Sequence, residues 1–295
     1  MSSALTRREM LAGGACWLAA GALARVGGAA PRSRVVLVRR PDVLDGAGAV
    51  RFAVLGEMLD DAVRTLLAAD TAGEAWRRLV APADVVGVKS NGWGSLPTPP
   101  ELEGLLVQRI RGAGVAADRV AVADQTVLRD PVFRRATALI NTRPMRTHAW
   151  SGLGTCLKNY IMFAEEPSHY HPDACDSLGS VWLLPHVKGK TRLNVLVMLT
   201  PQFHSVGPHA FSKSYTWRYN GLVVGADPVA VDTVGARIIT AKRLQHFGED
   251  RPISPPPRHI LSADTRYGVG TADPARIELI VRGDDRDLLV SAPMA

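Results

Sequence analysis

Residues 139–160, LINTRPMRTHAWSGLGTCLKNY, decide how the rest of the sequence is interpreted. The stretch begins with two apolar residues and becomes polar at Asn141. A basic patch with a histidine follows, formed by Arg143, Arg146 and His148. Two glycines then precede Thr155, where the pattern predicts the start of a helix. We expect a short buried strand that ends in a polar loop, which is where α/β folds bind their ligands.

A helix that begins in this way presents free backbone N–H groups and a partial positive charge. The Arg, His and Lys side chains around such a start would suit an anionic group such as a phosphate or a carboxylate. A basic surface loop with an ordinary helix cap is the alternative interpretation. The candidate ligand contacts are Lys89, Asn91, Arg146, His148, Thr155, Lys158 and Asn159.

Short apolar runs alternate with helical patterns along the chain. The predicted strands are 35–38, 84–89, 119–123, 138–140, 192–199, 220–224 and 277–281. The predicted helices are 50–69, 72–79, 101–113, 155–163 and 229–239. Such alternation predicts an α/β fold with a mainly parallel, Rossmann-like sheet, right-handed crossovers and helices on both faces. Residues 31–295 are expected to form a single domain.

Three successive predicted strands end in polar side chains. The first of them ends at Lys89 and Asn91, the next at Asp124, and the third at Asn141. Because the carboxyl ends of parallel strands meet at one edge of a sheet, these side chains should become neighbours. This coincidence predicts a pocket along that edge.

Proton transfer and charge stabilisation at this pocket are assigned to His148 and Lys158, with Asn159 positioning the ligand. Asp232 lies on the first turns of the predicted helix 229–239, beside a strand, and could be a buried acid that meets Lys158 or Lys89. Asp227 is interpreted as a helix N-cap, which needs no further function. Cys156 lies at the predicted helix start, where its pKa would be lowered, but we favour a small buried apolar role.

A second constellation has the residue types of a metal site. His169, His171 and Cys175 lie in a loop stiffened by prolines, and a divalent metal would accept such N and S ligands. The alternative is a solvent-exposed loop with incidental histidines. The spacing matches no established zinc pattern.

Composition excludes several functions. The 295 residues carry a formal net charge of +7, but Lys and Arg are scattered along the chain. No basic motif interleaved with aromatic residues is present, so nucleic acid is not an expected partner. The sequence has neither a phosphate-binding GxxxxGK[ST] motif nor a GxSxG nucleophile elbow.

The N-terminal residues 1–30 have the pattern of a twin-arginine (Tat) signal peptide, with Arg7 and Arg8 before an apolar run rich in Ala and Gly. We expect export to the periplasm through the Tat translocase, cleavage, and no stable membrane span afterwards. The mature chain then keeps Cys156 and Cys175, which could form one disulfide. Two cysteines cannot hold a four-cysteine iron–sulfur cluster, so none is expected.

Several segments together resemble the domain-of-unknown-function 362 family. They are VVGVKSNGWG (85–94), VAVAD (120–124), LINTRPMRTH (139–148), GTCLKNY (154–160), NGLVVGADPVAVDTVGARII (220–239) and YGVGTADPARIELI (267–280). The resemblance implies an α/β fold and, for many relatives, a Tat signal, but no reaction. Many relatives also carry a ferredoxin-type cysteine run, which is missing here. Relatives often have an Asp where this sequence has Leu199 and Thr200.

The expected function is therefore that of an exported protein that binds a small anionic ligand, alone or with a metal, at the ends of its strands. Whether it is an enzyme stays open. The alternative is a non-catalytic periplasmic metal or ligand carrier, or an accessory factor of a redox system, that uses His169, His171 and Cys175.

Overall fold

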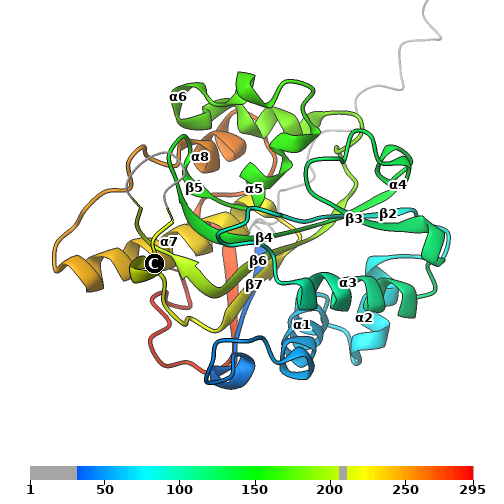
Figure 1. Ribbon diagram of the computed structural model, residues 1–295, viewed down its shortest axis with the longest axis horizontal. Coiled ribbons are helices and arrows are strands. Elements are labelled where there is room, and N and C mark those ends of the chain that lie inside the picture. The colour runs from blue at the N-terminus through cyan, green and yellow to red at the C-terminus, as the bar shows by residue number, and fades with distance from the viewer. Residues whose placement is uncertain (1–31, 206–210, 295) are drawn as a thin grey trace, which may run out of the picture. The chain divides into compact units, whose positions relative to one another are not determined.

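An eight-stranded sheet forms the centre of the described part of the chain (Figure 1). The computed structural model describes residues 32–205 and 211–294, so the predicted signal segment 1–30 lies outside them. The strand order is β3-β2-β4-β6-β7-β1-β8, and β5 pairs with β4 outside this path. The strands are β1 (Ser33–Arg39), β2 (Val86–Lys89), β3 (Val120–Ala123), β4 (Ala138–His148), β5 (Gly152–Gly154), β6 (Thr191–Gln202), β7 (Gly221–Gly225) and β8 (Ile277–Gly283).

Most strands along this path are parallel, which confirms the predicted mixed α/β class. Strands β3, β2, β4 and β6 run parallel to one another, as do β1 and β8. Strand β7 runs antiparallel to both of its neighbours. In the described part of the β6–β7 connection there is one short 3-10 turn, Lys213–Tyr215, and no crossover helix. A parallel arrangement needs such a crossover, which explains why the chain reverses here.

Helices cover both faces of the sheet, as predicted. Along β1, Val36 and Val38 pack with α1 (Phe52–Leu66), α2 (Ala72–Leu79) and α3 (Pro100–Gly112). The alternate residues Val35 and Leu37 face the opposite core, as the two-residue period of a strand requires. The helices on that second face are α4 (Pro131–Arg134), α5 (Cys156–Asn159), α7 (Pro228–Phe247) and α8 (Arg258–Thr265).

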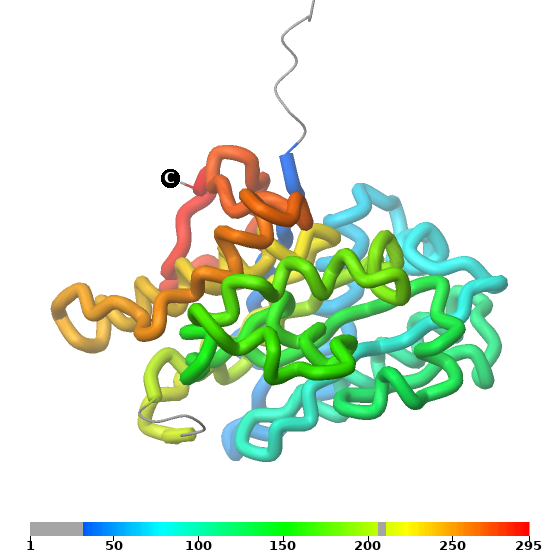
Figure 2. The backbone as a smooth tube through the Cα atoms, turned by 90° about the horizontal axis from the view of Figure 1, so that it is seen from above, coloured from blue at the N-terminus to red at the C-terminus, as the bar shows by residue number. Residues whose placement is uncertain are grey.

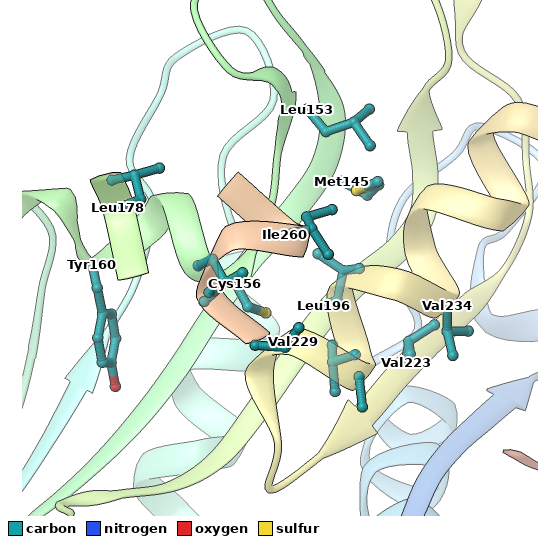
Figure 3. Close-up of a cluster of buried hydrophobic side chains, with 14 of the residues drawn as sticks. Met145, Leu153, Cys156, Tyr160, Leu178, Leu196, Val223, Val229, Val234 and Ile260 are labelled. Carbon is teal, nitrogen blue, oxygen red and sulfur yellow. The ribbon is translucent and has the colours of Figure 1, made fainter. Parts of the chain in front are cut away.

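Figure 3 shows the core of the second face, which supports the candidate site. Met145 and Leu196 come from the central strands, and Val234 comes from α7. Helix α7 is longer than the predicted helix 229–239 and begins at the expected cap, where Asp227 accepts the backbone N–H groups of Val229 and Ala230. The helix therefore gives α5 a rigid buried support.

Strand β4 differs most from expectation. The sequence predicts a strand at 138–140 followed by a loop, but β4 continues to His148 and all eleven of its residues are buried. The neighbouring strand β6 is also long and supplies a pairing partner beyond Asn141. Pro144 cannot donate to the ladder, and it lies directly before a register shift between β4 and β6. The polar residues of this stretch thus lie on a strand.

The segment after β5 is less regular than predicted. Helix α5 passes into a 3-10 turn, Tyr160–Phe163, and two further 3-10 stretches cover Pro167–Tyr170 and Asp176–Leu183. The sequence did not predict α8, which lies beside Asp176–Leu183 (Figure 2), and the Ser262 hydroxyl donates to the Asp176 carbonyl at 2.6 Å. In the short element labelled α6 (Pro172–Cys175), residues 173–175 have positive φ angles.

Among the described residues, no helix is both long and apolar enough to span a membrane.

Candidate functional site

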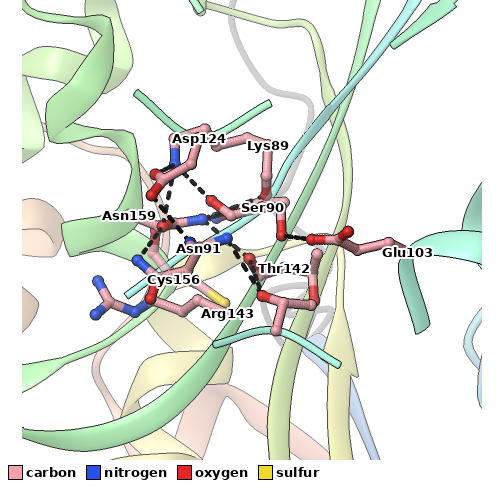
Figure 4. A network of polar contacts seen from close by, with 12 residues as sticks. Lys89, Ser90, Asn91, Glu103, Asp124, Thr142, Arg143, Cys156 and Asn159 are labelled. Atoms are coloured by element: carbon pink, nitrogen blue, oxygen red, sulfur yellow. Dashed lines mark hydrogen bonds and ion pairs between the residues drawn. The ribbon is translucent and has the colours of Figure 1, made fainter. Parts of the chain in front are cut away.

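Lys89 is the centre of a buried polar cluster at the carboxyl edge of the sheet (Figure 4). Its ammonium group donates to the Asp124 carboxylate at 2.6 Å, to the Ser90 carbonyl at 2.5 Å and to the Asn159 side-chain oxygen at 3.3 Å. An ammonium group has three N–H donors, so each has an acceptor. The second Asp124 oxygen accepts the backbone N–H of Gly92 at 2.9 Å.

Two asparagines connect this lysine to the neighbouring strands. The Asn159 amide nitrogen donates to the Asn141 side-chain oxygen at 2.8 Å and to the Thr142 carbonyl at 3.1 Å. Asn141 in turn donates to Asn194 of β6 at 3.0 Å. We call Lys89, Asp124, Asn141 and Asn159 the amide network. The predicted meeting of three strand ends is therefore present in the structure.

Asp232 has a different partner from the predicted one. It reaches from α7 to the start of α5, where its carboxylate oxygens accept the backbone N–H groups of Cys156 and Leu157, each at 2.8 Å. Neither Lys158 nor Lys89 is paired with it among the described ion pairs. Burial raises the pKa of Asp232 to about 7 against the opposing effect of these hydrogen bonds and of Arg143. The acid therefore acts as a cap on a short buried helix, supplied by another element.

Three cations lie beside the amide network and form what we call the cationic cluster: Arg143, Arg146 and Lys158. Their exposed fractions are 3%, 6% and 4%. None of the twelve ion pairs found in the described part of the chain includes any of them. Buried charges in proteins are ordinarily paired, so this cluster is incomplete as it stands.

The backbone explains how two arginines of one strand reach the same cavity. Residues three apart on a regular strand face opposite sides, but the register shift after Pro144 breaks that alternation before Arg146. Gly154, which pairs with Arg146, leaves the necessary space. A Cβ atom at Gly154 would lie 2.7 Å from a terminal nitrogen of Arg143.

The cationic cluster lines a cavity of about 280 Å³. Its other lining residues are Asn91, Trp93, Asp124, Gln125, His148, Trp150, Asn159, Ile161, Met162, Pro167 and His171. Three side-chain atoms of the lining residues are buried without a hydrogen-bond partner: Nε of Arg143, Nε of Arg146 and Oδ1 of Asn91. Polar atoms of this kind are rarely left unpaired, so they mark where a ligand would bind.

Aromatic rings hold parts of the cavity in place. The Arg146 guanidinium lies over the Trp93 ring, with 3.8 Å between Cζ and the ring centroid. Trp150 stacks on His171 with 4.2 Å between ring centroids. The Arg146–Trp93 contact orients a cation that would otherwise have many rotamers.

Burial and mutual repulsion lower the pKa values of the buried cations at this site. The pKa of Lys158 is lowered to about 8, mainly by burial; Cys175 opposes the shift, and Arg143 and Arg146 contribute to it. Burial likewise lowers the pKa of Arg146 to about 9. The pKa of Lys89 is also lowered to about 8 by burial, although Asp124 opposes the shift. An anion in the cavity would reverse part of these shifts.

His148 is a neutral imidazole at the edge of the same cavity. Burial and the nearby cations hold its pKa far below the ordinary value. Its Nδ1 accepts the Trp150 backbone N–H at 3.3 Å, which leaves the ring proton on Nε2. Thr155 does not line this cavity, and its hydroxyl hydrogen-bonds His259 at 3.1 Å.

The predicted metal ligands have separate surroundings. His169 is exposed, His171 stacks on Trp150, and Cys175 is buried beside Lys158. In the described part of the chain, no three or more His, Cys, Asp or Glu side chains gather as a metal ion would require. Cys156 and Cys175 are free thiols. Burial raises the pKa of Cys156 well above its usual value, as the apolar interpretation of this residue expects.

Sequence reasoning missed part of the lining. It noted Arg143 in the basic patch without assigning it to the site, and it did not select Trp93 or Trp150. A signal for Arg143 was present, because a strand as apolar as Ala138–Ile140 rarely continues into two arginines without a reason for burying them.

Comparison with known families gives one match. Residues 98–237 match the family described as "Domain of unknown function (DUF362)", so the chain contains a DUF362 domain over that range. The match includes the cationic cluster, Asp124 and Asp232, whereas Lys89, Asn91 and Trp93 precede it. No curated protein and no solved structure matches the chain.

Proposed function

We propose that the cavity at the strand ends binds a small anionic ligand through Arg143, Arg146 and Lys158. The observation that carries the proposal is the burial of three cations around one cavity without a carboxylate partner in the described chain. Burying an unpaired charge is unfavourable by several kcal/mol, and a bound anion would offset that desolvation penalty.

Each group of the site has a role in this proposal. The planar guanidinium groups of Arg143 and Arg146 match the geometry of a carboxylate or phosphate, and each has unused N–H donors. Asn91 and Asn159 position the ligand. Lys158 can transfer a proton, and the neutral His148 imidazole can donate a hydrogen bond from Nε2. A volume of about 280 Å³ favours a small metabolite over a nucleotide.

Export through the Tat pathway to the periplasm is part of the same proposal and rests on the sequence of residues 1–30. After export of the protein, the cavity would be accessible to extracytoplasmic metabolites.

Thermal unfolding in the presence of acetate, phosphate, pyruvate and malonate tests anion binding. A true ligand at a hundredfold excess over its Kd should stabilise the folded protein by about 3 kcal/mol. Arg143→Met and Arg146→Met should abolish that stabilisation, whereas the exposed Arg77→Met should keep it. The proposal fails if none of these anions raises Tm, or if the Arg143 and Arg146 variants respond as Arg77→Met does.

A further inference from the structure

Lys158 differs chemically from the other buried lysine. Its amine lines the cavity, and its polar neighbour is the Cys175 thiol rather than a carboxylate. Lys89, by contrast, has three oxygen acceptors and does not line the cavity. An amine that is desolvated beside other cations is the kind that proteins use as a nucleophile toward carbonyl groups.

Its protonation state permits this chemistry near neutral pH. With a pKa of about 8, roughly one-tenth of the Lys158 side chains carry a free electron pair at pH 7. A solvent-exposed lysine has on the order of a hundredfold less of the neutral amine at that pH.

We propose that Lys158 forms a Schiff base with a small 2-oxo acid bound in this cavity. The proposal rests on the anion site, because Arg143 and Arg146 would hold the carboxylate of that acid. Holding the carboxylate there keeps the adjacent carbonyl carbon in the same small cavity as the amine, which favours attack.

The condensation balances without an oxidant or a cofactor. The nitrogen electron pair of neutral Lys158 forms the C–N bond, and the carbonyl oxygen accepts both amine protons and leaves as water. A proton from solvent remains on the imine nitrogen. His148 is neutral with its proton on Nε2, so it is a hydrogen-bond donor and not a strong acid in this step.

Reductive trapping tests the inference on the full chain. The protein is incubated with pyruvate and cyanoborohydride at pH 7, and the modified lysine is located by peptide mass mapping. Lactate has the same carboxylate but no carbonyl group, so it should bind without forming an adduct. We expect one adduct, on Lys158, formed on the order of a hundredfold faster than at exposed lysines.

Two variants define the site of reaction. Lys158→Arg should give no trapped adduct, and the exposed Lys188→Arg should react as the unmodified sequence does. A measurement on the unmodified chain does not depend on the folding of either variant. The trapping rate should rise with pH and level off above about pH 8, because the neutral amine is then predominant.

The outcomes separate the two proposals. If pyruvate and lactate both raise Tm but no adduct forms at Lys158, the Schiff base is excluded and the anion site stands. If neither ligand nor any other anion raises Tm, the anion site itself is wrong. Trapping that occurs mainly at Lys89 or Lys188, or that keeps rising toward pH 10, also overturns the Schiff base.

Discussion

Two adjacent groups of buried polar side chains differ in how their charges are satisfied. In the amide network, the Lys89 ammonium has three acceptors, one of them the Asp124 carboxylate. In the cationic cluster, Arg143 and Arg146 are also buried, but among the described residues each donates to a single carbonyl, at 3.5 Å and 3.3 Å. The same edge of the sheet therefore holds one completed network and one incomplete one.

This difference separates structure from function at the site. A domain has about 5–15 kcal/mol of net stability, and each unpaired buried charge lowers the free energy of unfolding by several kcal/mol. In the amide network, the hydrogen bonds that join β2, β4 and α5 offset the desolvation of its polar groups. No carboxylate of the described residues forms an ion pair with the cationic cluster, and this contrast is the reason for assigning it to a ligand.

The largest effect expected from breaking this contrast is at Asp124. Asp124→Ala would leave the Lys89 ammonium buried without its counter-charge and remove the acceptor of the Gly92 N–H. We expect the free energy of unfolding to fall by about 3 kcal/mol, measured by urea denaturation. The exposed Asp118→Ala is the control and should change it little. A loss no larger than that of the control would mean that the amide network is not structural.

A smaller effect of opposite sign is expected at Lys158. Lys158→Met removes an unpaired cation from beside two arginines, so the ligand-free protein should become about 2 kcal/mol more stable at pH 7. Lys89→Met should instead destabilise it, because Asp124 would lose its partner. Equal effects of the two substitutions would contradict the distinction between the two groups.

The pH dependence of the Lys158→Met difference provides an independent check. The folded pKa of Lys158 is about 8 and its ordinary value is 10.5. Between these values the unfolded chain binds more protons than the folded protein, so the unfolding free energy of the unmodified protein rises with pH. The advantage of Lys158→Met should therefore shrink as pH rises from about 8 to about 10.5. Lys89 is present in both proteins, so its titration cancels.

Much of the fold could be predicted because it depends on local patterns. Short apolar runs such as the one within 84–89 indicated buried strands, and the amphipathic pattern of residues 50–69 indicated α1. The length of β4 could not be predicted, because its polar half is a strand only through pairing with β6. The antiparallel direction of β7 could not be predicted either, because it follows from the lack of a crossover helix in the described part of the β6–β7 connection. Short helices such as α8 give only a weak pattern in the sequence.

The site divides in the same way. Parallel strands must end at a common edge, so the neighbourhood of Lys89, Asp124 and Asn141 followed from topology. Partners are set by three-dimensional detail, which explains the wrong partner for Asp232: a buried helical acid was expected to meet a lysine, but it meets backbone N–H groups. Arg143 was not assigned because the residues after Asn141 were expected to form a loop, whereas β4 continues through them and buries them.

The smallest expected effect concerns the orientation of Arg146. Its guanidinium lies over Trp93, a contact worth about 1 kcal/mol at a partly exposed site. Trp93→Leu would release the guanidinium, and the entropy of re-ordering it would then oppose ligand binding. The affinity for the anion identified by thermal unfolding should fall about fivefold in calorimetric titration, which corresponds to about 1 kcal/mol. The half-buried Trp217 does not line the cavity, so Trp217→Leu should bind as the unmodified protein does. If Trp93→Leu binds equally well, Arg146 is held by the strand alone, and its position is as fixed as that of the amide network.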